Sequence, residues 1–341
     1  MDFTPTEAQT EARDLAARIF GDLATHDRLK AAGTGSDPEL WKSLCAAGLV
    51  AAVAELGLLG LVLLLEEQGR TTAQAPYAAS CVYGVLALTA HGSAEQRDRL
   101  LPAVEDGSAV VAGALPAQSG VRASARGELT GTVPVVPWLR DATHVLVADA
   151  ERRLWLAPLG RGTGIAPVEL TAPWSAARLT LERAPAEPLG GRRAYADVLA
   201  TARTAFAGLQ AGVCAGSLAR AVAHTGTREQ FGRPLATRQA VQLRAADAHM
   251  DTEAIRVTAY ESAWRRDAGL PYAPHALTAA WWASEAGQRV VHTGQHLHGG
   301  TGADLDHPVH RHFLWGRQLD AYLGCGAEVL QELGELIAHG G

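Results

Sequence analysis

The sequence predicts a mainly α-helical protein with a small β-domain between two helical parts. Apolar residues recur at helical spacing over the first hundred residues and again after residue 194. Between about 108 and 188 the chain consists of short β-branched or alternating runs separated by Gly, Pro and Asp. We therefore expect an N-terminal helical domain (1–107), a middle antiparallel β-domain (108–190) and a C-terminal helical bundle (194–338).

Composition and charge narrow the class of protein. The 341 residues are 48% hydrophobic and 19% charged, which is typical of a globular chain with a sizeable core. The net charge of −6 argues against a dedicated nucleic-acid binder. The cysteines are far apart and form no CxxC pair, so we expect neither a zinc knuckle nor a disulfide framework, and a reduced, cytoplasmic setting. The N-terminus lacks the basic and apolar segments of a signal peptide.

The N-terminal part begins and ends its helices at recognisable signals. Pro5-Thr6-Glu7 offers a cap and an acidic first turn, and Ser93 with Gln96 has the spacing of a capping box, opening a helix expected to stop near Pro102. The almost wholly apolar stretch Leu44–Leu65 approaches the length of a membrane span. Because it contains Glu55 and three glycines and lacks flanking arginine clusters, it predicts a buried helix or helix pair. Glu55 and Glu66 flank the apolar helix and are expected to mark its solvent edge.

The middle part is predicted to form strands wherever β-branched or alternating residues lie between turn-forming residues. Each candidate strand is a run of five to nine residues, β-branched or alternating, with Gly, Pro or Asp nearby. The expected strands are 110–114, 128–136, 143–147, 153–157 and 177–181. Gly190-Gly191 and the basic pair after them are expected to form the linker to the second helical part.

The C-terminal part is predicted to contain two long antiparallel helices joined by Thr225–Pro234. Residues 203–224 are rich in alanine and free of proline, and a second helical pattern follows Gln239. This arrangement places Arg228 and Gln239 near the junction of the two helices. The larger apolar residues of the second helix share one face: Leu243, Met250, Ala254, Val257, Tyr260 and Trp264.

Two motifs in this part resemble the C-terminal domain of acyl-CoA dehydrogenases. They are Arg228-Glu-Gln-Phe-Gly-Arg-Pro-Leu with Gln239, and, about sixty residues later, His296-Leu-His-Gly-Gly-Thr-Gly302. Gly92-Ser-Ala-Glu-Gln96, followed by Leu-Pro and Asp-Gly, is similar to the N-terminal domain of the same family. The resemblance implies a helical domain, a middle β-domain and a C-terminal four-helix bundle, with FAD held by the two motifs across a subunit interface.

The resemblance also implies roles for particular residues. Arg228 would pair with the pyrophosphate of FAD, because a guanidinium matches phosphate geometry. Phe231 would pack on the adenosine, Gln239 would donate to a polar edge of the cofactor, and the amides of Gly299 and Gly300 would approach phosphate or ribose oxygens. His296 stands where the family usually has Gln.

The catalytic base of the family is missing from this sequence. An acyl-CoA dehydrogenase removes the α-proton of the thioester with a glutamate. The two positions at which related enzymes place that glutamate are here Ala202 and Leu323. The loop that contacts the flavin ring is also altered, since 114–121 and 136–139 keep only Ser119 and Trp138 as loose equivalents. We therefore expect no catalytic residue in this chain.

The retained cofactor motif and the missing base together resemble the non-catalytic subunit of α2β2 acyl-CoA dehydrogenases that act on steroid side-chain CoA thioesters. That resemblance implies a catalytic homologue as partner, an acyl-CoA bound mainly in the partner's pocket, and an electron-acceptor flavoprotein. Two alternatives stay open. One is a homomeric scaffold or regulator of the same fold. The other is a homomeric flavoenzyme with a relocated base, or an oxidase-like or nitro-compound relative.

The remaining polar residues of the C-terminal part favour structural roles. His292 and His296 have the i,i+4 spacing of a metal-binding pair, but no HExxH motif is present, so we expect no functional metal. Glu253, Glu261 and Glu285 are expected to be surface or ion-pair residues.

Overall fold

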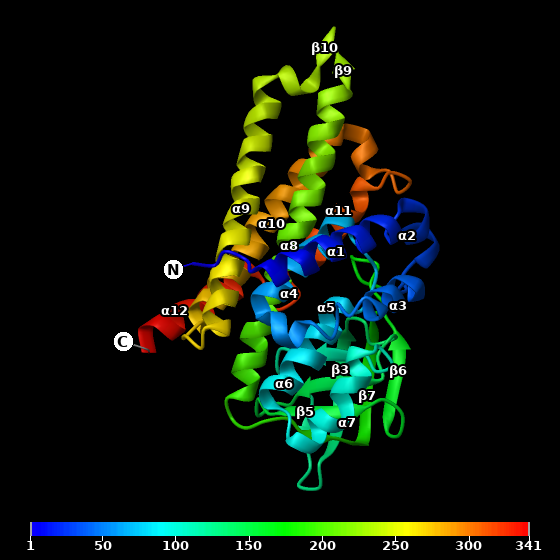
Figure 1. Cartoon of the computed structure of the whole chain (residues 1–341), viewed down its shortest axis with the longest axis vertical. Coiled ribbons are helices and arrows are strands. Elements are labelled where there is room, and N and C mark those ends of the chain that lie inside the picture. Colours follow the sequence, from blue (N-terminus) through cyan, green and yellow to red (C-terminus); the bar gives the residue numbers. More distant parts are fainter. Residues whose placement is uncertain (1, 340–341) are drawn as a thin grey trace.

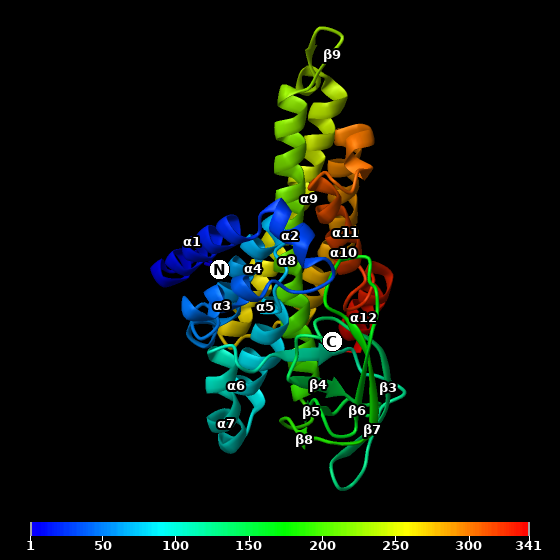
Figure 2. The same ribbon diagram turned by 90° about the vertical axis from the view of Figure 1, so that its right-hand side faces the viewer.

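The computed structural model describes residues 2–339 and has the predicted helical–sheet–helical order. Two sheets form one end of the molecule, and a helical hairpin made by α8 and α9 projects from the other end (Figure 1). The N-terminal helices lie on one side of α8, and α10 and α11 lie on the other (Figure 2). The expected fold class, mainly helical with a small β-domain, is therefore confirmed, whereas the domain bounds of 1–107, 108–190 and 194–338 stay a prediction.

Two of the N-terminal helices begin directly after the capping residues that the sequence predicted. Thr6 and Ser93 each form a reciprocal capping box with the glutamine three residues later. The helix after Ser93 continues to Glu105, so the predicted stop near Pro102 is wrong. A proline inside a helix removes one N–H, and the carbonyl that loses this donor belongs to the exposed Asp98. The elements are α1 (Glu7–Leu23), α2 (His26–Ala32), α3 (Pro38–Ala46), α4 (Val53–Thr71), α5 (Tyr77–Ala79), the π-helical η1 (Ser80–Leu86), α6 (Ala87–His91) and α7 (Ala94–Glu105).

The apolar stretch Leu44–Leu65 is the predicted helix pair. It spans the end of α3 and most of α4, and most of its α4 residues are buried. A kink divides α4 at Gly57, whose φ of 72° is unfavourable for residues with a side chain. The carboxylate of Asp267 accepts hydrogen bonds from the amides of Leu58 and Leu59, both at 2.8 Å, and so caps the helix after the kink. Among residues 2–339, only α8 is long and apolar enough to cross a membrane, and 72% of its apolar window is buried inside the chain.

Buried polar contacts join α4 to the C-terminal helices. Glu66 is 4% exposed and accepts a hydrogen bond from Arg256 at 3.0 Å, so its predicted place at the solvent edge is wrong. The reason is that α9 packs against α4 and brings a guanidinium to the carboxylate. His312 is 1% exposed, and its Nε2 lies 3.0 Å from the carbonyl oxygen of Arg70.

The buried His312 predicts a loss of stability in acid. Burial lowers its pKa to about 4, from an ordinary value of 6.5. As the pH falls between these values, the unfolded chain binds a proton that the folded chain does not. The free energy of unfolding should therefore fall by up to about 1.4 kcal/mol per pH unit. Urea unfolding of wild type and His312→Asn between about pH 7 and 4.5 tests this, since the variant should have the shallower slope. Equal slopes would contradict it.

The middle part contains two four-stranded sheets, with strand orders β1-β4-β5-β8 and β2-β3-β7-β6. All five predicted strands are present. The pairing of β1 with β4 is parallel, so the expectation of a wholly antiparallel domain is wrong for this pair. The strands β2 and β3 lie in the connection between β1 and β4, which gives it the length that a parallel crossover requires. The bounds are β1 (Val111–Ala114), β2 (Arg122–Ala123), β3 (Glu128–Val136), β4 (His144–Ala148), β5 (Leu154–Pro158), β6 (Thr163–Pro167), β7 (Ala177–Pro185) and β8 (Glu187–Pro188).

The C-terminal part contains the predicted pair of long antiparallel helices, α8 (Ala194–Thr227) and α9 (Gln239–Asp267). A two-stranded hairpin and a short 3-10 turn join them at the tip. The remaining elements are β9 (Glu229–Gln230), β10 (Arg233–Pro234), η2 (Leu235–Thr237), α10 (Ala273–His298), η3 (Gly299–Ala303), α11 (Val309–Leu319) and α12 (Gly326–His339).

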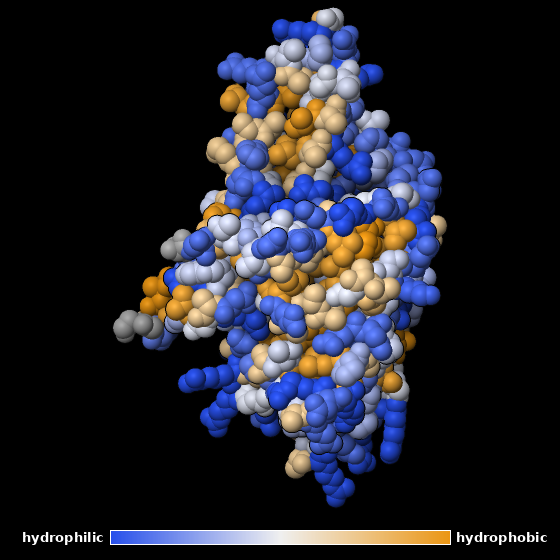
Figure 3. Space-filling model, viewed as in Figure 1, coloured by the Kyte–Doolittle hydropathy of each residue, from blue (hydrophilic) through white to orange (hydrophobic). Residues whose placement is uncertain are grey.

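Part of the apolar face predicted on α9 does not pack inside this chain. The buried side of α9 is made mostly of small residues, among them Ala248, Ala259 and Ala263. Apolar side chains gather on the surface of the projecting hairpin (Figure 3). We call the exposed large apolar residues of α8 and α9 the apolar strip: Val222, Leu243, Met250 and Val257. A strip of this kind on a long hairpin favours contact with another subunit.

Candidate cofactor site

A cavity of about 550 Å³ lies where the C-terminal end of α8 meets the C-terminal end of α10. It brings together four of the predicted cofactor residues, namely Arg228, His296, Gly299 and Gly300. Gly299 ends α10 with φ of 61°, a conformation that favours glycine, and nothing lies within 4 Å of a Cβ placed on Gly299 or Gly300. The backbone here is therefore open to close approach by a ligand.

The other two predicted cofactor residues do not line this cavity. Phe231 is in the turn of the hairpin with φ of 55° and is 90% exposed, and the guanidinium of Arg238 lies 5.1 Å from its ring centroid. Gln239 is the first residue of α9 and is also exposed. Both side chains are thus left largely free at the tip, where a second molecule has access to them.

The cavity also contains two histidines that the sequence analysis did not select as cofactor residues. His298 is 4% exposed, and its ring stacks on that of His224 with centroids 4.7 Å apart. Burial, followed by the neighbouring His298, lowers the pKa of His224 and of His307, whose ring lies 5.1 Å from His298. A local signal existed for His224, because it is four residues before Arg228 and therefore on the same helix face.

The lining of the cavity suits an anion. Among the residues that the structure describes, no aspartate or glutamate lines it. Its polar groups are a guanidinium, imidazoles, hydroxyls, one side-chain amide and the backbone of two consecutive glycines: Arg228, His224, His296, His298, Thr225, Thr301, Gln230, Gly299 and Gly300. This set of donors fits a diphosphate, the group that links the two halves of FAD.

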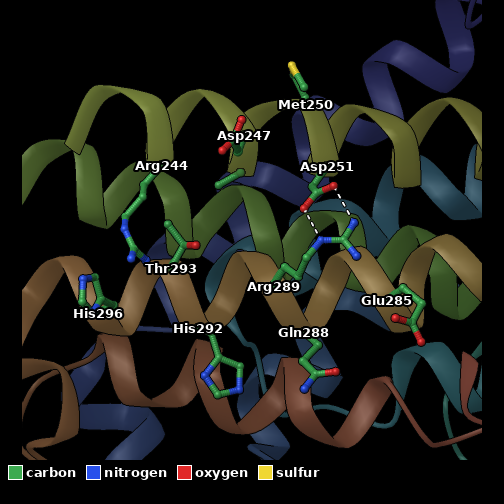
Figure 4. Close-up of a pocket in the computed structure, with 11 residues that line it drawn as sticks. Arg244, Asp247, Met250, Asp251, Glu285, Gln288, Arg289, His292, Thr293 and His296 are labelled. Atoms are coloured by element: carbon green, nitrogen blue, oxygen red, sulfur yellow. Dashed lines mark hydrogen bonds and ion pairs between the residues drawn. The ribbon is translucent and has the colours of Figure 1, made fainter. Parts of the chain in front are cut away.

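A second, open groove of about 1000 Å³ runs between α9 and α10 and shares His296 with the first cavity. Arg289 of α10 donates two hydrogen bonds, of 2.8 and 2.7 Å, to Asp251 of α9 across this groove (Figure 4). His292 packs its ring against Phe313 at 4.9 Å. Over the described part of the chain, no group of three or more His, Cys, Asp and Glu side chains is placed to hold a metal ion.

The two positions of the missing base, Ala202 and Leu323, lie in the same buried region. Ala202 is fully buried and Leu323 is 6% exposed. The guanidinium of Arg203, the residue after Ala202, donates to the carbonyl oxygen of Leu323 at 3.2 Å and pairs with Glu332 at 2.7 Å. The space left beside Leu323 is only about 20 Å³, and no carboxylate is among its lining residues in the described chain.

Aromatic side chains fill the rest of this region. Trp138 stacks on Trp174 with centroids 4.5 Å apart, and Phe206 meets the edge of Tyr322 at 4.8 Å. Burial raises the pKa of Tyr83 and Tyr322, whose hydroxyls lie 3.0 Å apart and remain protonated at neutral pH. We call this group the aromatic cluster, and its members come from all three parts of the chain: Tyr83, Trp138, Trp174, Phe206, Trp315 and Tyr322.

Comparison with known proteins identifies the family. The models for the acyl-CoA dehydrogenase N-terminal and C-terminal domains match residues 6–108 and 190–333. These matches define an oxidoreductase of the class that acts on CH–CH bonds. Acyl-CoA dehydrogenase FadE27 of Mycobacterium tuberculosis is 34% identical over 99% of both chains. The chain therefore belongs to the acyl-CoA dehydrogenase family, a family of FAD-dependent enzymes, as the two motifs predicted.

Two solved structures are among those that resemble the whole chain. A chain of the Tcur3481–Tcur3483 steroid ACAD G363A variant has a TM-score of 0.93 and 42% identity, covering 98% of both chains. A chain of the ChsE4–ChsE5 complex from Mycobacterium tuberculosis has a TM-score of 0.93 and 31% identity, covering 99% of both. The second of these structures is a complex of ChsE4 and ChsE5, which agrees with the expected heteromeric arrangement.

Proposed function

We propose that this chain is the non-catalytic subunit of a heteromeric, FAD-dependent acyl-CoA dehydrogenase. The observation that supports this most strongly is the filled region around Ala202 and Leu323. Two apolar residues occupy the base positions, and a residual space of about 20 Å³ cannot admit a thioester or a flavin ring. The cationic cavity that would hold a diphosphate is nevertheless open at the other end of the bundle.

In this proposal the two subunits divide the chemistry. The catalytic partner supplies a carboxylate that takes the α-proton of the acyl-CoA, and a hydride leaves the β-carbon, so that a double bond forms between the two carbons. FAD, when bound, accepts that hydride. This chain contributes Arg228, Gly299 and Gly300 to the diphosphate, and His296 beside them. Phe231 and Gln239 reach the cofactor from the exposed tip.

The partner and the substrate class rest on further support. Two structurally similar chains belong to a steroid ACAD and to a two-protein complex. This similarity favours a catalytic homologue, an α2β2 assembly and a steroid-type acyl-CoA bound mainly in the partner's pocket. The apolar strip and the groove between α9 and α10 offer surface for that partner. The proposal also includes an electron-acceptor flavoprotein and a cytoplasmic location. The location agrees with the four cysteines, which form no disulfide among the described residues.

The two alternatives have less support in the structure. A scaffold that binds no cofactor would not need a cavity for an anion. The cavity here is lined by Arg228 and three histidines, and by no carboxylate of the described chain. A homomeric enzyme with a relocated base would need a carboxylate beside the substrate position, and the space next to Leu323 has none in the described chain.

Co-expression with the catalytic homologue encoded nearest to this gene tests the proposal. We expect a yellow heterotetramer on size exclusion, with acyl-CoA dehydrogenation, whereas this chain purified alone should be colourless and inactive. A yellow, active homo-oligomer would refute the proposal and favour a relocated base. A colourless homo-oligomer that takes no partner would favour the scaffold.

A further inference from the structure

We propose that His298 and His224 form a proton-coupled phosphate site, so that binding of the FAD diphosphate at this cavity takes up a proton. The inference rests on the proposed function, because it concerns the same shared cofactor. It adds two residues to which the sequence analysis gave no role toward the cofactor, and a dependence of FAD affinity on pH.

The hydrogen bond made by His298 determines which of its nitrogens carries a proton. Its Nδ1 lies 2.7 Å from the carbonyl oxygen of Gly294, one turn earlier on α10. A carbonyl oxygen can only accept, so Nδ1 must be the protonated nitrogen. In the neutral ring Nε2 therefore has a lone pair and no hydrogen. His298 lines the cavity, and its Nε2 has no hydrogen-bond partner among residues 2–339.

A phosphate oxygen cannot bind to that lone pair. It is negatively charged and is itself an acceptor, so two lone pairs would face each other across a nearly buried site. A proton on Nε2 converts the repulsion into a charge-assisted hydrogen bond. The C-terminal end of α10, where His298 is the last residue, also favours a positive charge because of the helix dipole.

The surroundings of His224 disfavour a positive charge on its ring before an anion binds. The ring stacks on that of His298 at 4.7 Å with an interplanar angle of 25°, and it makes no hydrogen bond within residues 2–339, so the two rings compete for positive charge. Burial, followed by the neighbouring His298 and a nearby arginine, lowers the pKa of His224 and of His307. The charged and titratable groups around the pair are Arg220 on α8, Arg228 directly after α8, His296 on α10, and Asp304 and His307 in the segment before α11.

The expected consequence is a linkage between FAD and protons. If one proton enters with each FAD, the affinity for FAD falls by about tenfold per pH unit over the range in which the ring is neutral in the empty cavity and protonated in the complex. The diphosphate of FAD keeps its charge throughout this range, so the slope would come from the protein.

Calorimetric titration of FAD into the flavin-free heteromeric complex tests the proposal. Two buffers of different ionisation enthalpy give the number of protons taken up at about pH 7.5. We expect about one proton per FAD for wild type and close to none for His298→Gln, which removes the nitrogen that takes the proton. His224→Phe keeps the aromatic stack and leaves Nε2 of His298 in place, so it should retain the uptake of about one proton. His339→Gln, an exposed histidine at the end of α12, should behave as wild type.

The outcomes separate this inference from the proposed function. FAD binding that depends on Arg228 but takes up no proton would overturn the inference and leave the shared cofactor site intact. No FAD binding by the complex would overturn both. Proton uptake retained in His298→Gln, or lost in His224→Phe, would also overturn the inference. Should His298→Gln not fold, the proton NMR signal of the His298 ring titrated with ADP still decides the question. Bound ADP should move that signal toward the position of a protonated imidazole, and an unchanged signal would overturn the inference.

Discussion

The Arg228→Ala variant of this chain, assembled with its catalytic partner, is expected to lose most of its FAD. Arg228 is the arginine of the cavity, and a hydrogen bond between a guanidinium and a charged group contributes about 1.5–3 kcal/mol. Its removal should therefore weaken FAD binding by roughly 10- to 100-fold. The ratio of flavin to protein absorbance after size exclusion, and the dissociation constant of added FAD, measure the effect.

Two matched variants sharpen this test. Arg233→Ala removes an exposed arginine of the same hairpin that does not line the cavity, and it should retain FAD. Arg228→Lys keeps the charge but loses the paired geometry, and its FAD affinity should lie between wild type and alanine. An intact heterotetramer that holds full FAD with Arg228→Ala would contradict the assignment. Loss of the tetramer itself would show that Arg228 acts on assembly.

Restoring a glutamate at the family's base position, as Leu323→Glu, is expected to destabilise the chain without giving it activity. The side chain at this position is 6% exposed, and the free space beside it is about 20 Å³. A carboxylate without a new partner there should cost several kcal/mol of unfolding free energy, or bind a proton and no longer serve as a base. Ala202→Glu should behave similarly, because Ala202 is fully buried inside α8.

The free energy of unfolding and the dehydrogenase activity of the separately purified chain are the two measurements. Cys325→Glu provides the control, since this exposed residue two positions later should accept the charge with little loss of stability. Leu323→Gln introduces a side chain of the same shape as glutamate but without its charge. The difference in unfolding free energy between Leu323→Gln and Leu323→Glu therefore measures the effect of the charge. A Leu323→Glu chain that is stable, yellow and active alone would show that the aromatic cluster does not fill the site.

Local sequence signals predicted most of the secondary structure. The capping boxes at Thr6 and Ser93 and the apolar spacing of α8 act over three to ten residues, so neighbouring residues decide them. The signals failed where a distant segment intervened. Glu66 is buried because Arg256 reaches it from α9, and β1 pairs with β4 in parallel because two strands lie in the connection between them. Neither partner is visible in the local pattern.

For the site, the sequence by itself determined the chemical groups that are present and those that are missing. Arg228, the Gly299-Gly300 pair and the apolar residues at 202 and 323 are properties of the chain, and with the motif spacing they predicted the family. The tertiary structure alone decided which groups meet. It stacked His224 on His298 and closed the region around Leu323 with aromatic residues from three parts of the chain. The physical reason is that packing, rather than spacing along the chain, sets the distance between side chains on different elements.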